Sequence, residues 1–341
     1  MRIALDATYS IGDALSGVGV YSREILNGLA ASRFADRWDW FYRWHSYRVG
    51  RWLPKPRGVT GRLLADSWGN RSADLFHGLN QRLPQKRFRR QVATFHDLFV
   101  LTGDYSTPEF KTRFALQARD AAAGADIIIA VSAFTATQIE EQLAIPASRI
   151  RVIHHGVTRR NIPDLPREKI VLSVGALQRR KNQAMLVRAF RALPDDWTLV
   201  LAGSQGYGAA EITEAVAASP ARERIRITGF LNDEQIGEWY ARARIFAFPS
   251  LDEGFGMPVL EAMDAGIPVV AANTSAIPEV CGDAADLIDP MSEEELAAAL
   301  VRLASDKPHR EELVTRGHRR AAKFKWEKAV SETIEVYRQL L

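Results

Sequence analysis

Residues 245–272 have the sequence IFAFPSLDEGFGMPVLEAMDAGIPVVAA, with two short apolar runs on either side of a helical pattern. The runs 245–248 and 268–271 have the length and apolar character of buried strands. Between them, a glycine-rich turn at 253–256 leads into a helical pattern at 257–265. The stretch therefore predicts a strand, a helix and a second strand parallel to the first.

The same alternation extends through the rest of the second half. Further strands are predicted there at 170–174, 198–202 and 225–228, and further helices at 182–193 and 233–243. Such alternation builds a parallel sheet with helices on both faces, and ligands then bind beyond the carboxyl ends of the strands.

The first half follows the pattern less regularly. Its predicted strands are 2–7, 39–42, 75–76, 91–95, 127–131 and 150–153, and its predicted helices are 20–31, 110–123 and 133–143. The stretch 161–167 has two prolines and no periodicity, so it is the predicted linker. We expect an α/β protein with Rossmann-like domains at 1–163 and 164–324, followed by a last helix at 325–341. Three helices are expected to end the chain, from Glu293, Pro308 and about Trp326.

The composition is that of an ordinary globular protein. A chain of 341 residues, 47% hydrophobic and 25% charged, is long enough for two such domains. A single cysteine, Cys281, excludes a disulfide framework and a cysteine-cluster metal site, and makes a reducing, cytosolic setting the default expectation. The opening residues 1–7 predict a strand rather than a secretion signal, and no membrane-spanning run is expected.

The net charge of +4 is unevenly spread. Basic residues concentrate in 33–90, where five of the eight tryptophans also lie. Such a face suits anionic phospholipid headgroups or a phosphorylated acceptor, and it would also suit nucleic acid. A solvated arginine surface over a buried strand explains the pattern equally well.

Three short motifs follow predicted strands. Gly17 and Gly19 precede a helix, where backbone N–H groups can meet a phosphate, although Ser22 stands where a full dinucleotide fingerprint has its third glycine. His96 ends a strand and could donate to a sugar hydroxyl or a phosphate, or merely orient its loop. Arg180 and Lys181 lie where a helix begins, which favours binding of a diphosphate.

The strongest motif is Glu253 through Glu261. The first glutamate lies on a glycine-rich loop, and the second lies eight residues later in the predicted helix. Each carboxylate can accept hydrogen bonds from a pair of hydroxyls, one pair on a hexose and one on a ribose. The loop N–H groups of Phe255, Gly256 and Met257 can meet sugar and phosphate oxygens. A glycosidase-like acid and base pair is the competing chemical interpretation.

Taken in order, these motifs resemble glycosyltransferase family 4, the retaining group with the GT-B fold, in which two Rossmann-like domains face each other across a cleft. The resemblance covers nearly the whole chain. The residues that carry it are Gly17, Gly19, His96-Asp97, 130–135, His155-Gly156-Val157, Arg180-Lys181-Asn182, 201–204, 227–231 and 253–261. Ala176 stands where many members have arginine, and Arg179 could replace that charge.

The resemblance implies a role for each site residue. Arg180 and Lys181 would hold the donor diphosphate, Glu261 the ribose, and Glu253 with Phe255, Gly256 and Met257 the transferred sugar. From the first domain, Gly17 and Gly19 would approach the sugar phosphate and His96 would contact the sugar. Gly229 and Phe230 would present main-chain groups to the base, and the last helix would cross back to the first domain.

The resemblance further implies the chemistry. We expect a hexosyltransferase that needs no cofactor or metal, because two cations and a helix terminus can neutralise the leaving diphosphate. GDP-mannose is the first-choice donor, ahead of UDP-glucose and UDP-N-acetylglucosamine. The expected acceptor is a glycan or lipid-linked acceptor in polysaccharide biosynthesis, contacted by loops at 77–82 and 102–108. The protein would be cytoplasmic, with peripheral membrane contact through its basic first domain.

Three other functions remain as alternatives. A sugar-nucleotide epimerase of the same fold would alter the sugar without an acceptor. A nucleic-acid-binding protein would use the basic segment 33–90, but it leaves Glu253 and Glu261 without a role. A dinucleotide-dependent oxidoreductase ranks lower still, because of Ser22.

Overall fold

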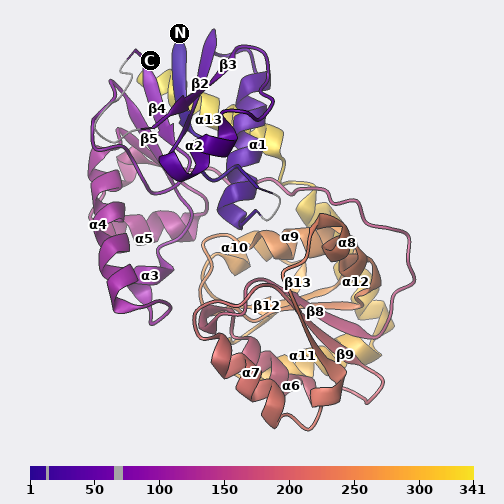
Figure 1. The fold of residues 1–341 in the computed structure, drawn as a ribbon. Helices are drawn as coiled ribbons and strands as arrows, with labels where there is room; N and C mark the ends of the chain where they lie inside the picture. Colours follow the sequence, from indigo (N-terminus) through magenta and orange to yellow (C-terminus); the bar gives the residue numbers. More distant parts are fainter. Residues whose placement is uncertain (13–14, 65–71) are drawn as a thin grey trace. The chain divides into compact units, whose positions relative to one another are not determined.

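The structure, a computed structural model, describes residues 1–12, 15–64 and 72–341; residues 65–71 of the basic segment 33–90 lie outside the described residues. The chain divides into two compact units (Figure 1). The first comprises Met1–Thr102, Thr107–Gly156 and Lys325–Leu341, and the second comprises Gly103–Ser106 and Val157–Phe324. Residues 153–168 contain no helix or strand.

The first unit is built on a parallel sheet in the order β3-β2-β1-β4-β5-β6-β7. Its strands are β1 Arg2–Asp6, β2 Arg37–Tyr42, β3 Val59–Leu63, β4 Leu75–Gly78, β5 Gln91–Phe95, β6 Ile127–Ala130 and β7 Ile150–Val152. Its helices are α1 Gly17–Ala31, α2 Trp44–Gly50, α3 Phe99–Thr102, α4 Pro108–Gly124, α5 Ala133–Leu143, the 3-10 turn Ala147–Arg149 and α13 Trp326–Leu340.

The second unit is built on a parallel sheet in the order β10-β9-β8-β11-β12-β13. Its strands are β8 Ile170–Val174, β9 Thr198–Ala202, β10 Ile225–Gly229, β11 Ile245–Phe248, β12 Val269–Ala272 and β13 Ala285–Ile288. Its helices are α6 Gln183–Phe190, α7 Ala209–Ala218, α8 Asp233–Arg242, α9 Met257–Asp264, α10 Ile277–Cys281, α11 Glu293–Ser305, α12 Lys307–Ala321 and the 3-10 turns Arg179–Lys181 and Arg222–Arg224. The predicted class, α/β with two Rossmann-like domains, is confirmed.

Each sheet reverses its strand order at one place. In the first sheet, β1 lies between β2 and β4, so the chain moves outward from β1 in both directions. In the second sheet, β8 lies between β9 and β11 in the same way. Neighbouring loops diverge at such a switch point and leave a crevice beyond the strand ends, where ligands bind.

Several predicted element boundaries differ from those of the structure, and three of the differences have a clear physical cause. The helix expected at 182–193 starts one residue later, because Asn182 has a left-handed backbone with φ of 54°. The strand expected at 268–271 is β12, Val269–Ala272; Pro268 has no N–H to donate, and its carbonyl instead accepts from the Phe246 amide at 3.0 Å. Helix α1 starts at Gly17 rather than Val20, because the Ser16 hydroxyl caps it.

The last helix, α13, completes the core of the first unit. Its Ala329, Ile334 and Tyr337 are buried in one cluster with residues of β1 and α1. A Cβ on Gly28 of α1 would lie 2.4 Å from Val330 Cγ2, so the glycine allows these two helices to approach closely. Apolar burial of this kind is the main stabilising contribution to such packing.

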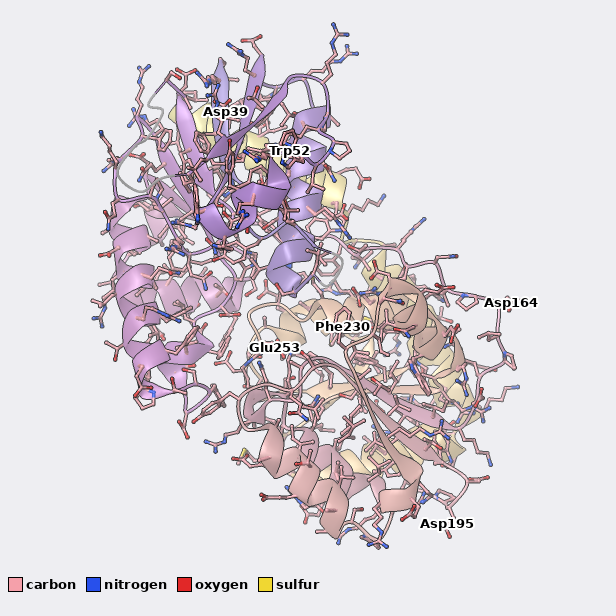
Figure 2. All side chains as sticks on the ribbon, in the orientation of Figure 1. Asp39, Trp52, Asp164, Asp195, Phe230 and Glu253 are labelled. Carbon is pink, nitrogen blue, oxygen red and sulfur yellow. The ribbon has the colours of Figure 1, made fainter. Side chains whose placement is uncertain are left out.

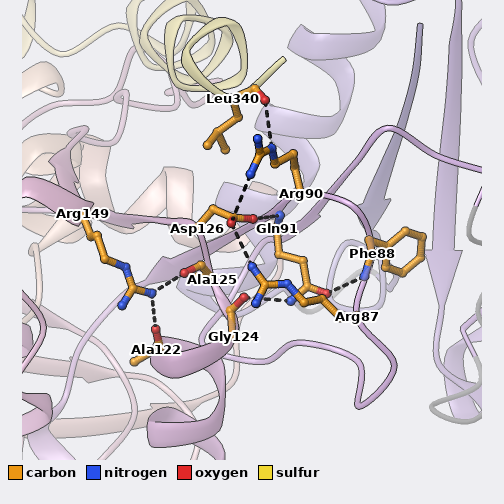
Figure 3. A network of polar contacts seen from close by, with 10 residues as sticks. All are labelled: Arg87, Phe88, Arg90, Gln91, Ala122, Gly124, Ala125, Asp126, Arg149 and Leu340. Atoms are coloured by element: carbon orange, nitrogen blue, oxygen red, sulfur yellow. Dashed lines mark hydrogen bonds and ion pairs between the residues drawn. The ribbon is translucent and has the colours of Figure 1, made fainter.

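A polar network at the start of β5 also reaches this helix (Figure 3). The Asp126 carboxylate accepts from Arg87 Nη2 at 2.8 Å and from the Gln91 amide at 2.7 Å. Arg90, 3.7 Å from Asp126 at its Nη1, donates from Nε to the Leu340 carbonyl at 3.2 Å. The network therefore connects the end of α13 to the edge of the sheet from which β5 and β6 begin.

Candidate active site

The second unit brings two predicted motifs together at its switch point. The segment with Arg180 and Lys181 follows β8, and the loop with Glu253 follows β11, which pairs with β8. Glu253 and Phe230 both follow strands of this sheet, and Figure 2 shows them at one end of it. The cationic and carboxylate motifs therefore meet beyond the strand ends at the switch point, where parallel sheets bind ligands.

Glycines allow the loops at this end to lie close together. Gly175, directly after β8, has φ of 146°, and a Cβ there would lie 3.3 Å from Lys181 Cε. Gly203, after β9, has φ of 158°, and its Cβ would be only 2.1 Å from the Gly175 carbonyl oxygen. No larger residue fits at Gly203 without moving the backbone of the neighbouring loop.

Arg180, Lys181 and Glu253 form a buried ion cluster. Lys181 Nζ lies 2.5 Å from Glu253 Oε1, and Arg180 Nη1 lies 2.9 Å from Glu253 Oε2. Arg180 Nη1 also donates to the Asp252 carbonyl at 2.5 Å, and the Arg180 carbonyl accepts from the Leu251 amide at 2.8 Å. The side chains of Arg180 and Glu253 are only about a tenth exposed. Two cations therefore share one carboxylate at a position shielded from water.

The pKa of Glu253 reflects this environment. Burial by itself would raise the pKa of this carboxyl, but the charges of Arg180 and Lys181 outweigh burial and lower it to about 2. Glu253 is therefore ionised at neutral pH and acts only as a hydrogen-bond acceptor. Its amide donates to the Ser275 hydroxyl at 3.1 Å, which fixes the loop from the other side. A proton donor, as in a glycosidase pair, needs a raised pKa, so Glu253 does not fit that role.

The loop after Glu253 turns directly into α9. Gly256 has φ of 102° and precedes Met257, the first residue of the helix. A Cβ on Gly256 would lie 2.7 Å from Ile277 Cδ1, so glycine is needed for space as well as for backbone conformation. Phe255 is buried and meets Phe324 edge to face, with ring centroids 5.8 Å apart. The first turn of α9 therefore follows directly on the loop after β11, where the N-terminus of a helix can bind an anion.

Glu261 lies within α9 and is held by two partners. Its Oε1 accepts from Arg160 Nη2 at 2.9 Å, and its Oε2 accepts from the Tyr240 hydroxyl at 3.0 Å. Arg160 also contacts Asp233 Oδ1 at 2.7 Å, on the first turn of α8. Burial lowers the pKa of Arg160, but Glu261 and its other neighbours more than reverse that effect. Each Glu261 oxygen keeps a second lone pair for another donor.

Arg160 and Tyr240 were not identified by the sequence analysis. Arg160 lies in the aperiodic stretch 153–168, and Tyr240 is one apolar position of helix α8 among others. Local sequence offers no signal for either, because their partner Glu261 is 101 residues from Arg160 and 21 residues from Tyr240.

Two further predicted residues, Gly229 and Phe230, follow β10 in the same unit. Gly229 has φ of 72°, and its carbonyl accepts from the Gly203 amide at 3.0 Å. Phe230 is 54% exposed, so a large aromatic ring projects from this loop. Arg179, whose charge could replace an arginine at position 176, contacts helix α7 instead: its Nε donates to Glu211 Oε1 at 2.9 Å. The loop at Gly229 thus lies beside the loop at Gly203, at the same end of the sheet as Glu253.

The first unit holds the remaining predicted residues. His96 follows β5 and is 6% exposed, with Nε2 2.9 Å from the Leu79 carbonyl. Burial lowers the pKa of His96 to about 4, so the ring is neutral at neutral pH and its Nε2–H donates to that carbonyl. Tyr21 meets the His96 ring edge to face at 4.7 Å, and His155 lies 5.4 Å from it.

The glycine motif of the first unit forms the start of α1. The Ser16 hydroxyl accepts from the Gly19 amide at 3.3 Å, and Gly17 is the first helical residue. A Cβ on Gly19 would lie 2.8 Å from the Tyr9 carbonyl oxygen, so this glycine lets the turn after β1 fold against the helix. The first turn of α1 thus follows β1 in the chain, with the Gly19 amide already bound by Ser16.

Two features are absent from the part of the chain that the structure describes. Within residues 1–12, 15–64 and 72–341, no group of three or more His, Cys, Asp or Glu side chains could hold a metal ion. Over the same ranges, none of the helices combines the length and the apolar character that crossing a membrane requires.

Comparison with known proteins places the chain in a family. The family described as "Glycosyl transferases group 1" matches residues 158–320, and the family described as "Glycosyltransferase Family 4" matches residues 40–160. The chain is 30% identical to the O-antigen chain mannosyltransferase B of Escherichia coli, over 98% of this chain and 99% of that protein. It is 28% identical to the serotype-specific mannosyltransferase WbdA of Escherichia coli over 74% of its own length, which spans about a third (34%) of that longer protein.

Two solved structures share the whole fold. Sucrose-phosphate synthase from Thermosynechococcus elongatus matches with a TM-score of 0.81 and 22% identity, over 99% of this chain and 98% of that one. HepE of Anabaena, in complex with UDP and glucose, matches with a TM-score of 0.74 and 18% identity, over 99% of each chain. The fold is therefore that of the GT-B glycosyltransferases. The chain belongs to glycosyltransferase family 4, and it is a glycosyltransferase related to mannosyltransferases.

Proposed function

We propose that this glycosyltransferase moves a mannosyl group from GDP-mannose to a glycan or lipid-linked acceptor, with retention of configuration and without a metal ion. The observation that carries the proposal is the cluster of Lys181 and Arg180 on Glu253, beside the first turn of α9. Mannose is favoured by the 30% identity to an O-antigen chain mannosyltransferase along nearly the whole chain.

The cluster supports the binding of a sugar diphosphate. Arg180 and Lys181 can donate to the diphosphate, while Glu253 accepts from hydroxyls of the transferred sugar. Arg180 and Lys181 carry two positive charges against the single negative charge of Glu253, so a net positive charge remains in this water-poor position to stabilise the negative charge that develops on a leaving phosphate. Glu261, held by Arg160 and Tyr240, would accept from the ribose hydroxyls.

The reaction would occur on one face of the sugar. The bond between the anomeric carbon and the phosphate oxygen breaks, and the acceptor oxygen bonds to the anomeric carbon from the same side. The acceptor proton passes to the phosphate oxygen that leaves, so GDP is released and no separate protein base is required. Glu253, with a pKa of about 2, is too weak a base to take that proton at neutral pH.

The decisive experiment combines donor choice and product analysis. A thermal-shift panel of GDP-, UDP-, ADP- and TDP-sugars identifies the donor, because a ligand that binds the folded protein raises its melting temperature. Transfer is then run with the selected donor in the presence and absence of EDTA, and NMR gives the anomeric configuration of the product. We expect selection of GDP-mannose, an α-linked product and no effect of EDTA; an inverted product rules out the one-face reaction.

An epimerase is distinguished by the same assay. It would convert the donor sugar and release nucleotide without any acceptor, whereas a transferase links release of GDP to formation of a glycosylated product. A labelled donor incubated with and without acceptor therefore separates the two functions.

We also propose that the first unit contacts anionic phospholipid at a membrane surface. Trp44 and Trp52 are 69% and 76% exposed, and the Arg51 guanidinium lies 4.7 Å from the Trp52 ring centroid (Figure 2 labels Trp52). Aromatic rings with neighbouring cations suit the headgroup region of an anionic bilayer. Sedimentation with phosphatidylglycerol vesicles should exceed that with phosphatidylcholine vesicles, and Trp44→Ala with Trp52→Ala should abolish the difference. Equal sedimentation with both vesicles contradicts this surface.

A further inference from the structure

One face of helix α8 packs against the stretch of chain that carries Arg160. Residues 233, 237 and 240 are spaced four and three apart, so they lie on the same face of this helix. Asp233 Oδ1 lies 2.7 Å from Arg160 Nη1, and the Arg160 guanidinium carbon lies 5.9 Å from the Tyr240 ring centroid. Between these two contacts, a Cβ on Gly237 would lie 2.7 Å from the Asn161 carbonyl oxygen. The glycine therefore allows the stretch to approach the helix closely at this point.

The backbone on the other side of Arg160 is also held. The Val157 amide donates to the Phe324 carbonyl at 3.1 Å, and both residues belong to the second unit, as Arg160 does. The Arg160 side chain is only 18% exposed. Although residues 153–168 contain no helix or strand, tertiary contacts on both sides thus determine where Arg160 lies.

Arg160 and Tyr240 together fix the carboxylate of Glu261. The last torsion of a glutamate side chain is broadly distributed, so rotamer preference alone does not set the plane of its carboxylate. Here Arg160 Nη2 donates to Oε1 at 2.9 Å, and the Tyr240 hydroxyl donates to Oε2 at 3.0 Å. One donor on each oxygen defines that plane and leaves each oxygen able to accept once more. Two neighbouring hydroxyls, such as those of a ribose, could supply one donor to each oxygen.

The shape of an arginine side chain suits this position. Its planar guanidinium contacts Asp233 through Nη1 and Glu261 through Nη2, and a lysine ammonium has no such fork. The Asp233 side chain is 78% exposed, so its ion pair contributes little. The Glu261 side chain is only 8% exposed, and loss of one partner from such a buried pair has a larger effect. The contact with Glu261 is therefore the one that matters for function.

We propose that Arg160 is a positioning residue for nucleotide recognition, which fixes the Glu261 carboxylate so that its two oxygens accept from the 2′- and 3′-hydroxyls of the donor ribose. The inference rests on the proposed function, in which Glu261 binds the ribose. It adds that selection of a ribonucleotide over a 2′-deoxyribonucleotide depends on Arg160, which acts through Glu261 and needs no contact with the nucleotide.

The test compares the affinities for GDP and 2′-deoxy-GDP, measured by calorimetric titration of the full-length protein. We expect the wild type to bind GDP about 10-fold more tightly, the effect of one hydrogen bond to a charged acceptor. In Arg160→Met this preference should fall below about 2-fold, mainly because GDP binds more weakly. Arg160→Lys keeps the charge without the fork and should show an intermediate preference of about 4-fold. Arg159→Met, at the exposed neighbouring arginine, is the matched control and should keep the wild-type preference.

Transfer kinetics provide a second measurement. Because the ribose takes no part in the bond changes, Arg160→Met should raise KM for the donor by about 10-fold and leave kcat nearly unchanged. A general disturbance of the second unit would instead weaken both nucleotides equally and lower kcat, because the ion cluster at Glu253 lies in the same unit. That result would overturn the positioning role.

The remaining outcomes separate this inference from the proposed function. If the wild type binds neither nucleotide, the choice of GDP-mannose fails, and the inference fails with it. If the wild type binds GDP and transfers the sugar but binds 2′-deoxy-GDP equally well, the transferase function stands and the inference is overturned. Tighter binding of GDP by Arg160→Met would show that Arg160 competes with the ribose for Glu261, which also overturns it. If Arg160→Met does not fold, Arg160→Lys decides, and an unchanged preference in that variant rejects the proposal.

Discussion

Lys181 Nζ lies 2.5 Å from Glu253 Oε1, although the two residues are 72 positions apart in sequence. The contact joins the loops after β8 and β11 at the switch point of the second sheet. Before a ligand binds, the Lys181 ammonium and the Glu253 carboxylate form an ion pair. When the donor binds, its diphosphate can contact the cations of Arg180 and Lys181, while its sugar hydroxyls can donate to the Glu253 carboxylate.

The first prediction separates the roles of these two residues. Glu253→Gln removes a negative charge beside the diphosphate site, so it should bind GDP at least as tightly as the wild type while transfer falls by about 100-fold or more. Lys181→Ala should instead weaken GDP binding by about 10-fold or more. Calorimetric titration with GDP and initial rates measure both effects. Lys169→Ala, an exposed lysine paired with Asp196, is the control. Equal loss of GDP binding in both variants would contradict the division of roles.

The sequence could predict this cluster because each motif directly follows a recognisable strand. The patterns at 170–174 and 245–248 are short, apolar and bounded by glycine or proline, so their carboxyl ends could be placed at one edge of a sheet. The order of the strands within the sheet was not predicted, because it depends on pairing between distant segments.

Other parts of the fold could not be predicted, for physical reasons. β3, Val59–Leu63, contains Gly61 and Arg62 and lies at the edge of its sheet, where one side needs no strand partner and the apolar pattern is weak. Arg160 reaches Glu261 from a stretch without periodicity.

The second prediction concerns pH. The pKa of Glu253 falls from 4.5 to about 2 on folding, so the folded state binds its proton less tightly than the unfolded state. This carboxylate therefore contributes stability in full above about pH 4.5, and the contribution is lost as pH falls toward 2. Its size is on the order of 3 kcal/mol. Urea unfolding of the wild type and Glu253→Gln should show a difference in unfolding free energy at neutral pH that shrinks below about pH 4.5. A difference that is constant down to pH 3 would be inconsistent with the ion cluster.

The third prediction concerns Glu261. If it binds the ribose, its contact is the same in the ground state and the transition state, so Glu261→Gln should raise KM for the donor by about 10-fold and leave kcat nearly unchanged. Asp233→Asn removes the other carboxylate that contacts Arg160, at an exposed position, and should alter neither parameter. Initial rates over a range of donor concentrations supply the measurement. A fall in kcat as large as the rise in KM would mean that Glu261 acts on the reacting sugar instead.

The last prediction concerns the attachment of α13. The Tyr337 hydroxyl lies 2.6 Å from His77 Nδ1, and His77 Nε2 lies 2.8 Å from Thr94 Oγ1, all within the buried core of the first unit. Burial lowers the pKa of His77 to about 3, so its ring is neutral at neutral pH. Tyr337→Phe would leave a buried ring nitrogen without its partner, and should lower the free energy of unfolding by about 1–3 kcal/mol.

Tyr47→Phe, at a half-buried tyrosine of α2, is the matched control and should change the free energy of unfolding by less than about 0.5 kcal/mol. Because Arg180, Lys181 and Glu253 belong to the second unit, Tyr337→Phe should leave the affinity for GDP unchanged. Unfolding in urea and calorimetric titration with GDP measure the two quantities on the same preparations. If Tyr337→Phe were as stable as the wild type, the hydroxyl would not hold α13 to the sheet, and the helix would depend on its other contacts, such as the apolar packing of Ala329 and Ile334.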